Sequence, residues 1–212
     1  MEKVVVHVLE TASLVGREDA CREVIAPRYR ERSHVGPEAR RLEALGTGLL
    51  ALALLGVRRD EDLVLGEYGK PSVRGAAEFN LSNDAGLVVL AMGSVGGPAI
   101  GVDVEEVPGV YRHVEELLAR KYYDAEELAA IGDGGTREGR IAYARAWTRR
   151  EAILKAMGTG LAVDPRRHPE VLEGWELRSR LMGDAVLTCA MREPFCMDVV
   201  PHDAPELLKM SQ

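Results

Sequence analysis

The chain has 212 residues, 46% of them hydrophobic, and a formal net charge of −7 at pH 7. This length allows one large domain or two domains of about 100 residues each, and the composition is typical of a globular protein. The acidic balance argues against nucleic-acid binding as the main role. The longest apolar run, residues 49–57, is about half the roughly 20 residues that a membrane-spanning helix needs, so no membrane segment is expected.

The start of the chain and its cysteines indicate a cellular compartment. Residues 1–10 contain a short apolar stretch between charged residues, which is not the pattern of a signal peptide. The three cysteines, Cys21, Cys189 and Cys196, are odd in number and lack metal-ligand spacing, so we interpret them as thiols in a reducing compartment. Together these features predict a soluble, cytoplasmic protein.

The first half of the chain is predicted to mix strands and helices. The expected strands are residues 4–9, 63–67, 78–82, 86–92 and 99–105, and the expected helices are residues 17–25 and 38–55. The helix at 38–55 is the clearest, because its apolar residues recur at helical spacing and Gly56 follows as a stop. Residues 69–77 contain glycines and a proline and are expected to form a loop.

The second half follows Pro108. Its expected helices are residues 113–120, 125–131 and 140–157, and its expected strands are residues 174–181, 185–191 and 197–200. Residues 132–139 hold four glycines and predict a flexible loop. The order of elements predicts an α+β protein of two halves, residues 1–108 and 109–212. The halves share no sequence similarity, so any duplication would be structural only.

Two acids alternate along the predicted strand at 99–105. Side chains of a strand point to opposite faces in turn, so Asp103 and Glu105 share one face and Val102 and Val104 the other. Adjacent carboxylates repel unless a cation or solvent separates them, which makes the pair a candidate metal site. Taken alone, two solvated acids at a strand end are the more common interpretation.

The helix at 140–157 carries a second set of candidate residues. Trp147, Glu151 and Lys155 are spaced four residues apart and therefore lie on one face of the helix. For this helix alone, the ordinary interpretation is a surface ion pair worth about 0.3–0.5 kcal/mol beside a core tryptophan.

Two earlier segments could bind an anion. Gly-Lys-Pro at 69–71 is a tight turn with one cation, and residues 79–84 form a strand that enters a turn, with the Ser82 hydroxyl and free backbone N–H groups as phosphate donors. A plain loop and hairpin fit equally well. The arginines at 28, 30, 32, 40 and 41 form either a local positive patch or a solvated helix face.

Taken together, these segments resemble the 4′-phosphopantetheinyl transferases, specifically the larger, monomeric, surfactin-synthetase-activating type. That family shows Gly-Lys-Pro, then Phe-Asn-(Leu/Ile)-Ser-His-Ser, then Gly-(Ile/Val)-Asp-(Ile/Val)-Glu, then Trp-x-x-Lys-Glu-Ala followed by Lys and Gly-x-Gly-Leu. This chain has Gly-Lys-Pro at 69–71, Phe-Asn-Leu-Ser-Asn-Asp at 79–84, Gly-Val-Asp-Val-Glu at 101–105, Trp-Thr-Arg-Arg-Glu-Ala at 147–152, Lys155, and Gly-Thr-Gly-Leu at 158–161. Their order and spacing match across residues 69–161.

The resemblance implies a fold and an activity. The fold would be two similar α+β halves related by a pseudo-twofold, in a monomer that binds coenzyme A in the cleft between them. The enzyme would be a holo-[acyl-carrier-protein] synthase that uses Mg²⁺. It would move the 4′-phosphopantetheine arm of coenzyme A to a serine hydroxyl of an apo acyl or peptidyl carrier protein and release 3′,5′-ADP.

The resemblance also implies roles for the catalytic and metal-binding residues. Asp103, Glu105 and Glu151 match the positions that hold Mg²⁺ in the family. Glu151 would also accept the proton of the serine, directly or through water, and Lys155 would stabilise or protonate the leaving phosphate.

Other matching positions are expected to bind coenzyme A. Lys70 and Pro71 in the Gly-Lys-Pro turn, and Ser82 and Asn83 on the strand, match positions at the nucleotide and its phosphates, where Lys155 also belongs. Either Arg28 or Arg32 would contact the 3′-phosphate.

Three positions depart from the family pattern. Asn83 replaces a histidine, Asp84 replaces a serine, and Arg150 replaces a lysine. Asn83 can donate a hydrogen bond but carries no charge, and Asp84 would repel a phosphate unless it faces solvent or caps a backbone N–H. We expect Arg150 to be a mild change if the site needs charge rather than a particular geometry. The alternative function is a non-catalytic relative that binds coenzyme A or a carrier protein.

Overall fold

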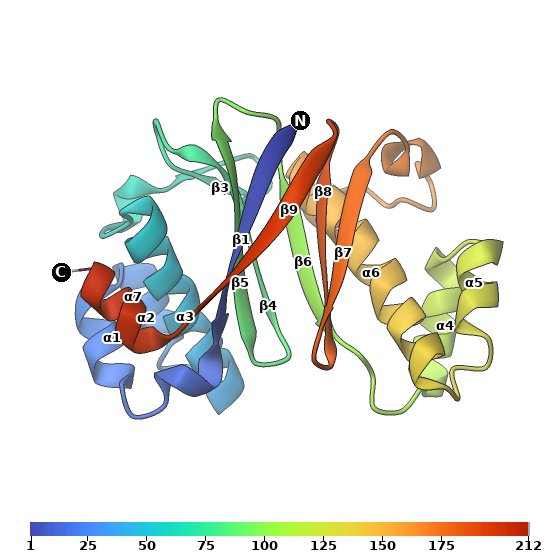
Figure 1. The fold of residues 1–212 in the computed structure, drawn as a ribbon, viewed down its shortest axis with the longest axis horizontal. Coiled ribbons are helices and arrows are strands. Elements are labelled where there is room, and N and C mark those ends of the chain that lie inside the picture. Colours follow the sequence, from blue (N-terminus) through green and yellow to red (C-terminus); the bar gives the residue numbers. More distant parts are fainter. Residues whose placement is uncertain (212) are drawn as a thin grey trace.

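The computed structural model describes residues 1–211 (Figure 1). Its strands are β1 (Glu2–Glu10), β2 (Val64–Leu65), β3 (Pro71–Ser72), β4 (Ala77–Asp84), β5 (Leu87–Val95), β6 (Gly101–Glu106), β7 (Glu176–Met182), β8 (Ala185–Met191) and β9 (Phe195–His202). Its α-helices are α1 (Glu18–Val24), α2 (Pro27–Arg32), α3 (Glu38–Leu55), α4 (His113–Tyr122), α5 (Ala125–Ile131), α6 (Arg137–Met157) and α7 (Ala204–Met210). The predicted α+β class is confirmed.

Two sheets repeat one strand arrangement. In the first sheet the order is β4-β5-β1-β9, and in the second it is β6-β8-β7. In each, the chain forms one strand, then helices, then an antiparallel hairpin whose second strand pairs with the first strand. The halves are therefore alike in topology although their sequences are not similar.

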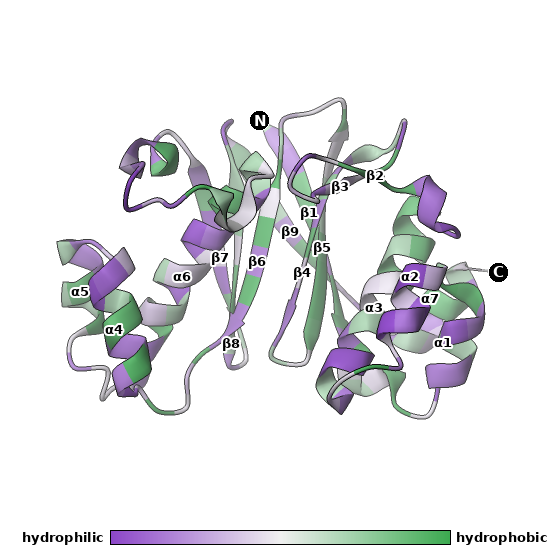
Figure 2. Ribbon diagram, turned by 180° about the vertical axis from the view of Figure 1, so that it is seen from behind, coloured by the Kyte–Doolittle hydropathy of each residue, from purple (hydrophilic) through white to green (hydrophobic). Residues whose placement is uncertain are grey.

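The two sheets pack against each other, and helices cover their outer faces (Figure 1). The inner layer of the core comes from both sheets and includes Val6 of β1, Val102 of β6 and Leu187 of β8. On the outer face of the first sheet, Leu45 and Leu49 of α3 pack against β5. Figure 2 shows hydrophobic residues concentrated on the central strands and many hydrophilic residues on the outer helices.

The end of the chain returns to the first half. β9 pairs in parallel with β1 along Glu2–Leu9, and α7 packs beside α3 through the buried Leu207. Grouping by contact therefore places residues 195–210 with the first half. The division into residues 1–108 and 109–212 stays a prediction.

The structure differs from the sequence predictions mainly at short elements. Helices α2 and α7, of six and seven residues, were not predicted, because such lengths give little periodic signal. Helix α6 begins at Arg137, inside the predicted glycine loop, where the Thr136 hydroxyl caps it by accepting from the Gly139 N–H. The predicted strand at 63–67 has only the two residues of β2. None of the helices within residues 1–211 has the length and apolar character to cross a membrane.

Candidate active site

Helix α6 lies unusually close to strand β6 at Gly101. A Cβ atom on Gly101 would stand 1.8 Å from the carbonyl oxygen of Ala152 and 2.5 Å from the amide nitrogen of Ala156, which no side chain tolerates. Glycine on the strand and alanines on the helix therefore let the two backbones touch. Because Glu151 and Lys155 neighbour these alanines, the contact holds their helical face over the acidic strand.

Asp103 is at the centre of this contact. Its side chain faces α6, while Val102 and Val104 are buried between the sheets, so the predicted alternation is confirmed. The residue is 2% exposed, and its Oδ1 accepts from the Ser82 hydroxyl at 2.9 Å and from the Lys155 ammonium at 2.6 Å. The other oxygen, Oδ2, is buried without a hydrogen-bond partner among residues 1–211.

The other two acids lie in the electrostatic field of Asp103. Burial raises the pKa of Glu105 to about 8, and the nearby carboxylates of Asp103 and Asp84 add to the rise. Burial, followed by the charge of Asp103, also raises the pKa of Glu151. Burial raises the pKa of Asp103 itself, against the influence of Lys155. These partly buried carboxylates therefore destabilise one another's charged forms.

A divalent cation would relieve this repulsion. Carboxylate oxygens are the ligands that Mg²⁺ prefers, and Oδ2 of Asp103, which has no hydrogen-bond partner among residues 1–211, could coordinate such an ion. The donor set therefore fits Mg²⁺ in its chemistry. No three His, Cys, Asp or Glu side chains of residues 1–211 already stand in metal-binding geometry, so the acidic side chains would have to turn toward one another on binding, on backbones that stay in place. The assignment of Asp103, Glu105 and Glu151 to a metal stays a prediction.

Lys155 contacts the strand residues rather than its neighbour on the helix. Its Nζ donates to Asp103 Oδ1 and, at 2.7 Å, to Ser82 Oγ. Among residues 1–211 its ion-pair partner is Asp103 and not Glu151, so the simple surface pair considered from the sequence is not formed. Ser82, Asp103 and Lys155 thus link β4, β6 and α6.

Side chains of β4 accept hydrogen bonds from backbone N–H groups on the edge of β6 that does not pair with β8. Asn80 Oδ1 accepts from the Val102 N–H at 2.9 Å, and Asp84 Oδ2 accepts from the Glu106 N–H at 2.8 Å. Asn80, Ser82 and Asp84 alternate along one face of β4, so all three reach toward β6. Asp84 is therefore a backbone cap, which the sequence analysis named as its harmless role, although its charge still acts on Glu105.

Lys70 is engaged by the protein itself. Its Nζ donates to Glu78 Oε1 at 2.8 Å and to the carbonyl oxygens of Ile100 and Ala156 at 3.1 and 3.2 Å. These bonds join the turn before β3 to the start of β6 and the end of α6. Pro71 begins β3 and pairs with Leu65. Contact of Lys70 and Pro71 with a nucleotide stays a prediction.

A second group of predicted residues meets on the far side of β4. Arg32 and Asn83 line a cleft of about 370 Å³ between α2, α3 and β4, together with Tyr29, Val35, Arg40, Glu43, Ala44 and Thr47. The Asn83 amide donates to Glu43 Oε2 at 2.7 Å, and Arg40 pairs with the same oxygen at 3.3 Å. Sequence reasoning missed Glu43, although a charged residue between the apolar positions of α3 was a signal.

Arg28 and Arg150 lie elsewhere. The backbone N–H of Arg28 donates to Asp60, and its guanidinium lies 5.8 Å from the centre of the Tyr29 ring. Arg150 turns away from the acids and pairs with Glu127 of α5. Trp147 packs edge-to-face on Tyr122, with ring centres 5.9 Å apart.

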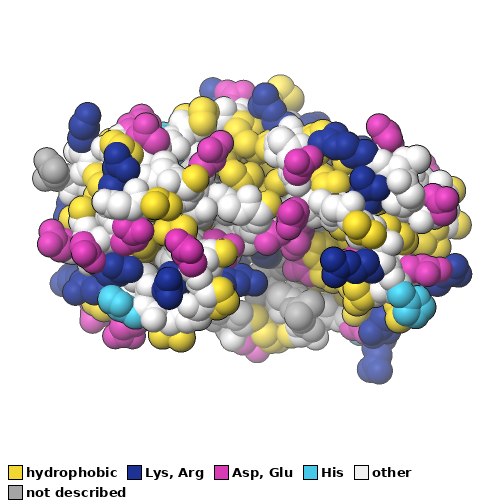
Figure 3. All heavy atoms as spheres, turned by 90° about the horizontal axis from the view of Figure 1, so that it is seen from below, with side chains coloured by type: hydrophobic (Ala, Val, Ile, Leu, Met, Phe, Trp, Pro, Cys, Tyr) yellow, Lys and Arg dark blue, Asp and Glu magenta, His cyan; other side chains and the backbone are white. Residues whose placement is uncertain are grey.

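The surface near the sheet ends is mixed in charge. Seen from below, Asp and Glu side chains lie in the middle and at both sides of this face, with Lys and Arg side chains among them (Figure 3).

Comparisons with known proteins agree with the resemblance found in the sequence. The model of the 4′-phosphopantetheinyl transferase superfamily matches residues 99–190, a range that includes Asp103, Glu105, Glu151 and Lys155. The 4′-phosphopantetheinyl transferase pptA of Paxillus involutus is 29% identical over 195 residues. That match covers 76% of this chain and 66% of the relative, slightly less than two thirds of the relative's length.

Proposed function

We propose that this chain, which carries a 4′-phosphopantetheinyl transferase superfamily domain, transfers the phosphopantetheine arm of coenzyme A to a serine of an apo carrier protein. The transfer would depend on Mg²⁺ and release 3′,5′-ADP. The observation that carries the proposal is the convergence of β6 and α6 at Gly101, which holds Glu151 and Lys155 over the buried Asp103. Phosphoryl transfer needs mainly positioned charge, and this site supplies both signs within one small volume.

Glu151 is the proposed proton acceptor. Its side chain is half-buried, and its raised pKa brings it closer to the range in which a carboxylate is an effective base near neutral pH. Mg²⁺ bound by Asp103, Glu105 and Glu151 would neutralise charge on the pyrophosphate. The protein's part is to hold these oxygens on a rigid strand and a rigid helix, so that the serine and the phosphorus meet in one orientation.

Lys155 is the proposed partner of the leaving phosphate. Its ammonium is half-exposed and already held by Asp103 and Ser82, which restricts its motion. When an anion arrives, Lys155 can donate its remaining N–H toward it while keeping one of these bonds. Ser82 would stay beside it as a second donor.

The nucleotide end of coenzyme A fits the cleft on the far side of β4. Arg32 and Arg40 are exposed cations at this cleft, and the Asn83 amide lies within it. β4 is the edge strand of its sheet, so the side chains of the consecutive residues Ser82 and Asn83 point to opposite faces of the sheet at that edge. An extended ligand that crosses this edge would place its 3′-phosphate near Arg32 and its pyrophosphate near Lys155. Arg28 would then act only through Tyr29.

The carrier protein would dock on α4. Val110, Val114 and Leu117 are exposed apolar side chains on and before this helix. The cations Arg112, Arg120 and Lys121 lie among them, and Arg120 pairs with Glu116 of the same helix. Carrier proteins tend to be acidic, so a surface that is locally apolar and basic suits them. This segment follows β6 directly in the chain.

Intact-mass analysis tests the proposal. The protein is incubated with coenzyme A, Mg²⁺ and either an apo acyl carrier protein or an apo peptidyl carrier protein, with a chelator as the matched control. A mass gain of one phosphopantetheine arm that disappears with the chelator supports the Mg²⁺-dependent transferase. Coenzyme A binding by calorimetry without any mass gain on either carrier would instead indicate the binding-only relative.

A further inference from the structure

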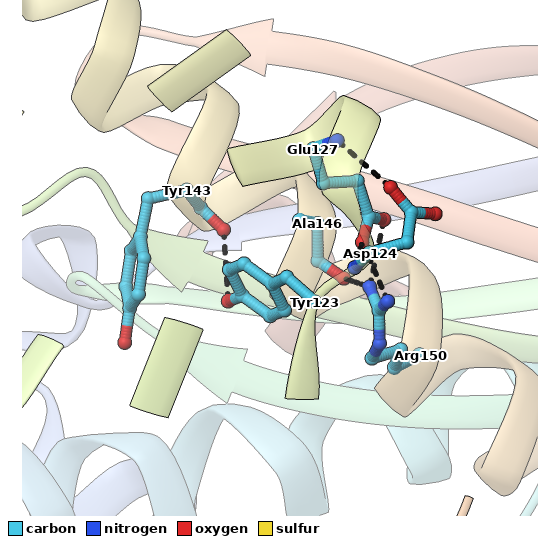
Figure 4. Close-up of polar contacts among 6 residues, drawn as sticks. All are labelled: Tyr123, Asp124, Glu127, Tyr143, Ala146 and Arg150. Carbon is cyan, nitrogen blue, oxygen red and sulfur yellow. Dashed lines mark hydrogen bonds and ion pairs between the residues drawn. The ribbon is translucent and has the colours of Figure 1, made fainter. Parts of the chain in front are cut away.

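Helix α5 is held to α6 by a buried ion pair that the proposed chemistry does not use. Arg150 donates to both carboxylate oxygens of Glu127, at 2.7 and 2.5 Å, and also to the carbonyl oxygen of Ala146 at 3.0 Å (Figure 4). The Arg150 and Glu127 side chains are only 11% and 18% exposed. A bidentate pair with this little exposure fixes both the distance and the angle between two helices.

An aromatic contact completes this attachment. The guanidinium of Arg150 lies 4.8 Å from the centre of the Tyr123 ring, and the Tyr123 hydroxyl donates to the carbonyl oxygen of Tyr143 at 3.1 Å. In Figure 4, Tyr143, Ala146 and Arg150 come from α6, while Tyr123, Asp124 and Glu127 come from the segment around the start of α5. Tyr123, between α4 and α5, therefore contacts α6 twice, through its ring and through its hydroxyl.

Helices α4 and α5 bury few residues of their own. α5 has seven residues, of which only Ile131 is buried, and the only buried residue of α4 is Ala119. A cluster that includes Tyr123, Tyr143 and Ala146 adds apolar contacts with α6. Apolar contacts are not directional, so they do not by themselves set one angle between the helices. A bidentate arginine–carboxylate bond has one preferred geometry and removes that freedom.

The arginine of this ion pair is next to a proposed catalytic residue in the sequence. Arg150 directly precedes Glu151, and on a helix consecutive side chains diverge by about 100°, so one points to α5 and the other to β6. Any tilt of α5 and α4 at Arg150 therefore changes the distance between the docking surface on α4 and the carboxylate of Glu151.

We infer that the Arg150–Glu127 pair is a positioning device that sets where a docked carrier protein presents its serine relative to Glu151. This inference rests on the proposed function. It also gives a role to Arg150, at a position where the family that this chain resembles has lysine. A lysine keeps the charge but cannot make two parallel bonds to one carboxylate, so here the geometry matters and the exchange is not mild.

Steady-state kinetics with separate variation of the two substrates tests this inference. The variants are Arg150→Lys, Glu127→Gln and the double variant, with Arg149→Lys as the matched control, because Arg149 is exposed and precedes Arg150 on the same helix. We expect each single variant to raise KM for the carrier protein by about tenfold, a change of about 1.4 kcal/mol. KM for coenzyme A should stay within about twofold. The double variant should have a KM for the carrier protein no higher than that of the more impaired single variant, because both changes break the same interaction.

Hydrogen exchange gives a readout that needs no transfer. Amides of residues 113–131 should exchange faster in both single variants, while those of α3 should stay as protected as in the unmodified protein. If Arg150→Lys fails to fold, Glu127→Gln alone decides. An unchanged KM for the carrier protein, or an equal rise in both KM values, overturns the inference. If the unmodified protein transfers nothing, the proposed function fails, and unchanged exchange in residues 113–131 would separately overturn the positioning role.

Discussion

The two halves share a topology but attach their helices in different ways. In the first half, α1, α2, α3 and α7 join one continuous apolar cluster on the sheet, centred on residues such as Leu45 and Leu49. On the helix-covered side of the second sheet the buried apolar residues fall into three smaller clusters, and a buried ion pair joins α5 to α6. One face of α6 is given to Glu151 and Lys155, so less of its surface is left for apolar packing. The half that carries the proposed catalytic helix depends more on directional polar bonds.

The largest expected effect is on the chemistry of the second half. Changing Glu151→Gln removes the proposed base and one proposed metal ligand but keeps the shape of the side chain, so transfer should fall by about 10³-fold or more. The fold should remain, because the side chain belongs to none of the apolar clusters. Initial rates and circular dichroism measure the two quantities. Glu138→Gln, an exposed position in the first turn of α6, is the control, and full activity in Glu151→Gln would refute the assigned role.

The next largest effect compares how much apolar packing and a polar bond contribute to the free energy of unfolding. Leu49→Ala removes a fully buried side chain from the large cluster of the first half and should lower the free energy of unfolding by about 2–5 kcal/mol. Tyr123→Phe removes only the bond to the Tyr143 carbonyl oxygen and should cost about 1 kcal/mol. Urea unfolding gives both values. If both variants lost the same free energy of unfolding, the two kinds of helix attachment would contribute equally to stability.

A smaller effect is expected at the docking surface. Leu117→Asp places a charge on an exposed side chain, so the free energy of unfolding should not change, while KM for an acidic carrier protein should rise several-fold. Val15→Asp is the control on the other half, because Val15 and Leu117 are both 53% exposed. Kinetics of carrier modification measure the change. A similar rise in KM for both variants would remove α4 as the specific site.

The smallest effect concerns pH and the first half. The rings of His7 and His202 lie at an interplanar angle of 20°, with His7 Nδ1 2.9 Å from His202 Nε2, and Glu206 stands 3.2 Å from His202 Nδ1. Burial, and then the charge of His202, lower the pKa of His7. The unfolded chain therefore takes up a proton more readily, and stability present above about pH 6.5 is lost as the pH falls below it.

Urea unfolding at each pH measures this loss as the pH falls below about 6.5. His7→Gln should flatten that part of the profile, whereas His113→Gln, an exposed histidine of the second half, should not. An unchanged slope in His7→Gln would show that other groups cause the pH dependence.

Much of the fold follows from periodic patterns in the sequence. Helix α3 was predicted at its observed bounds, because apolar side chains at helical spacing are a local property of the chain. The same holds for the alternation of Asp103 and Glu105 with the buried valines of β6. Short elements without a full period, such as α2 and α7, left no comparable signal.

The partners of the polar side chains could not be predicted in this way. Lys70 bonds to the carbonyl oxygen of Ala156, and Asn83 bonds to Glu43, across 86 and 40 residues of chain. Arg150 could face either a phosphate or another helix until α5 was placed beside it. Such pairs depend on how the elements pack, and no spacing in the sequence encodes them.

The position of β9 has a consequence for biogenesis. β1 is synthesised before its parallel neighbour β9, and the strands and helices from β6 to β8 are made in between. During that interval β1 presents an open hydrogen-bonding edge to the surrounding chains, which is a recognised route to aggregation. Production yield should therefore be most sensitive to changes in residues 195–202, even though these residues lie outside the proposed catalytic centre.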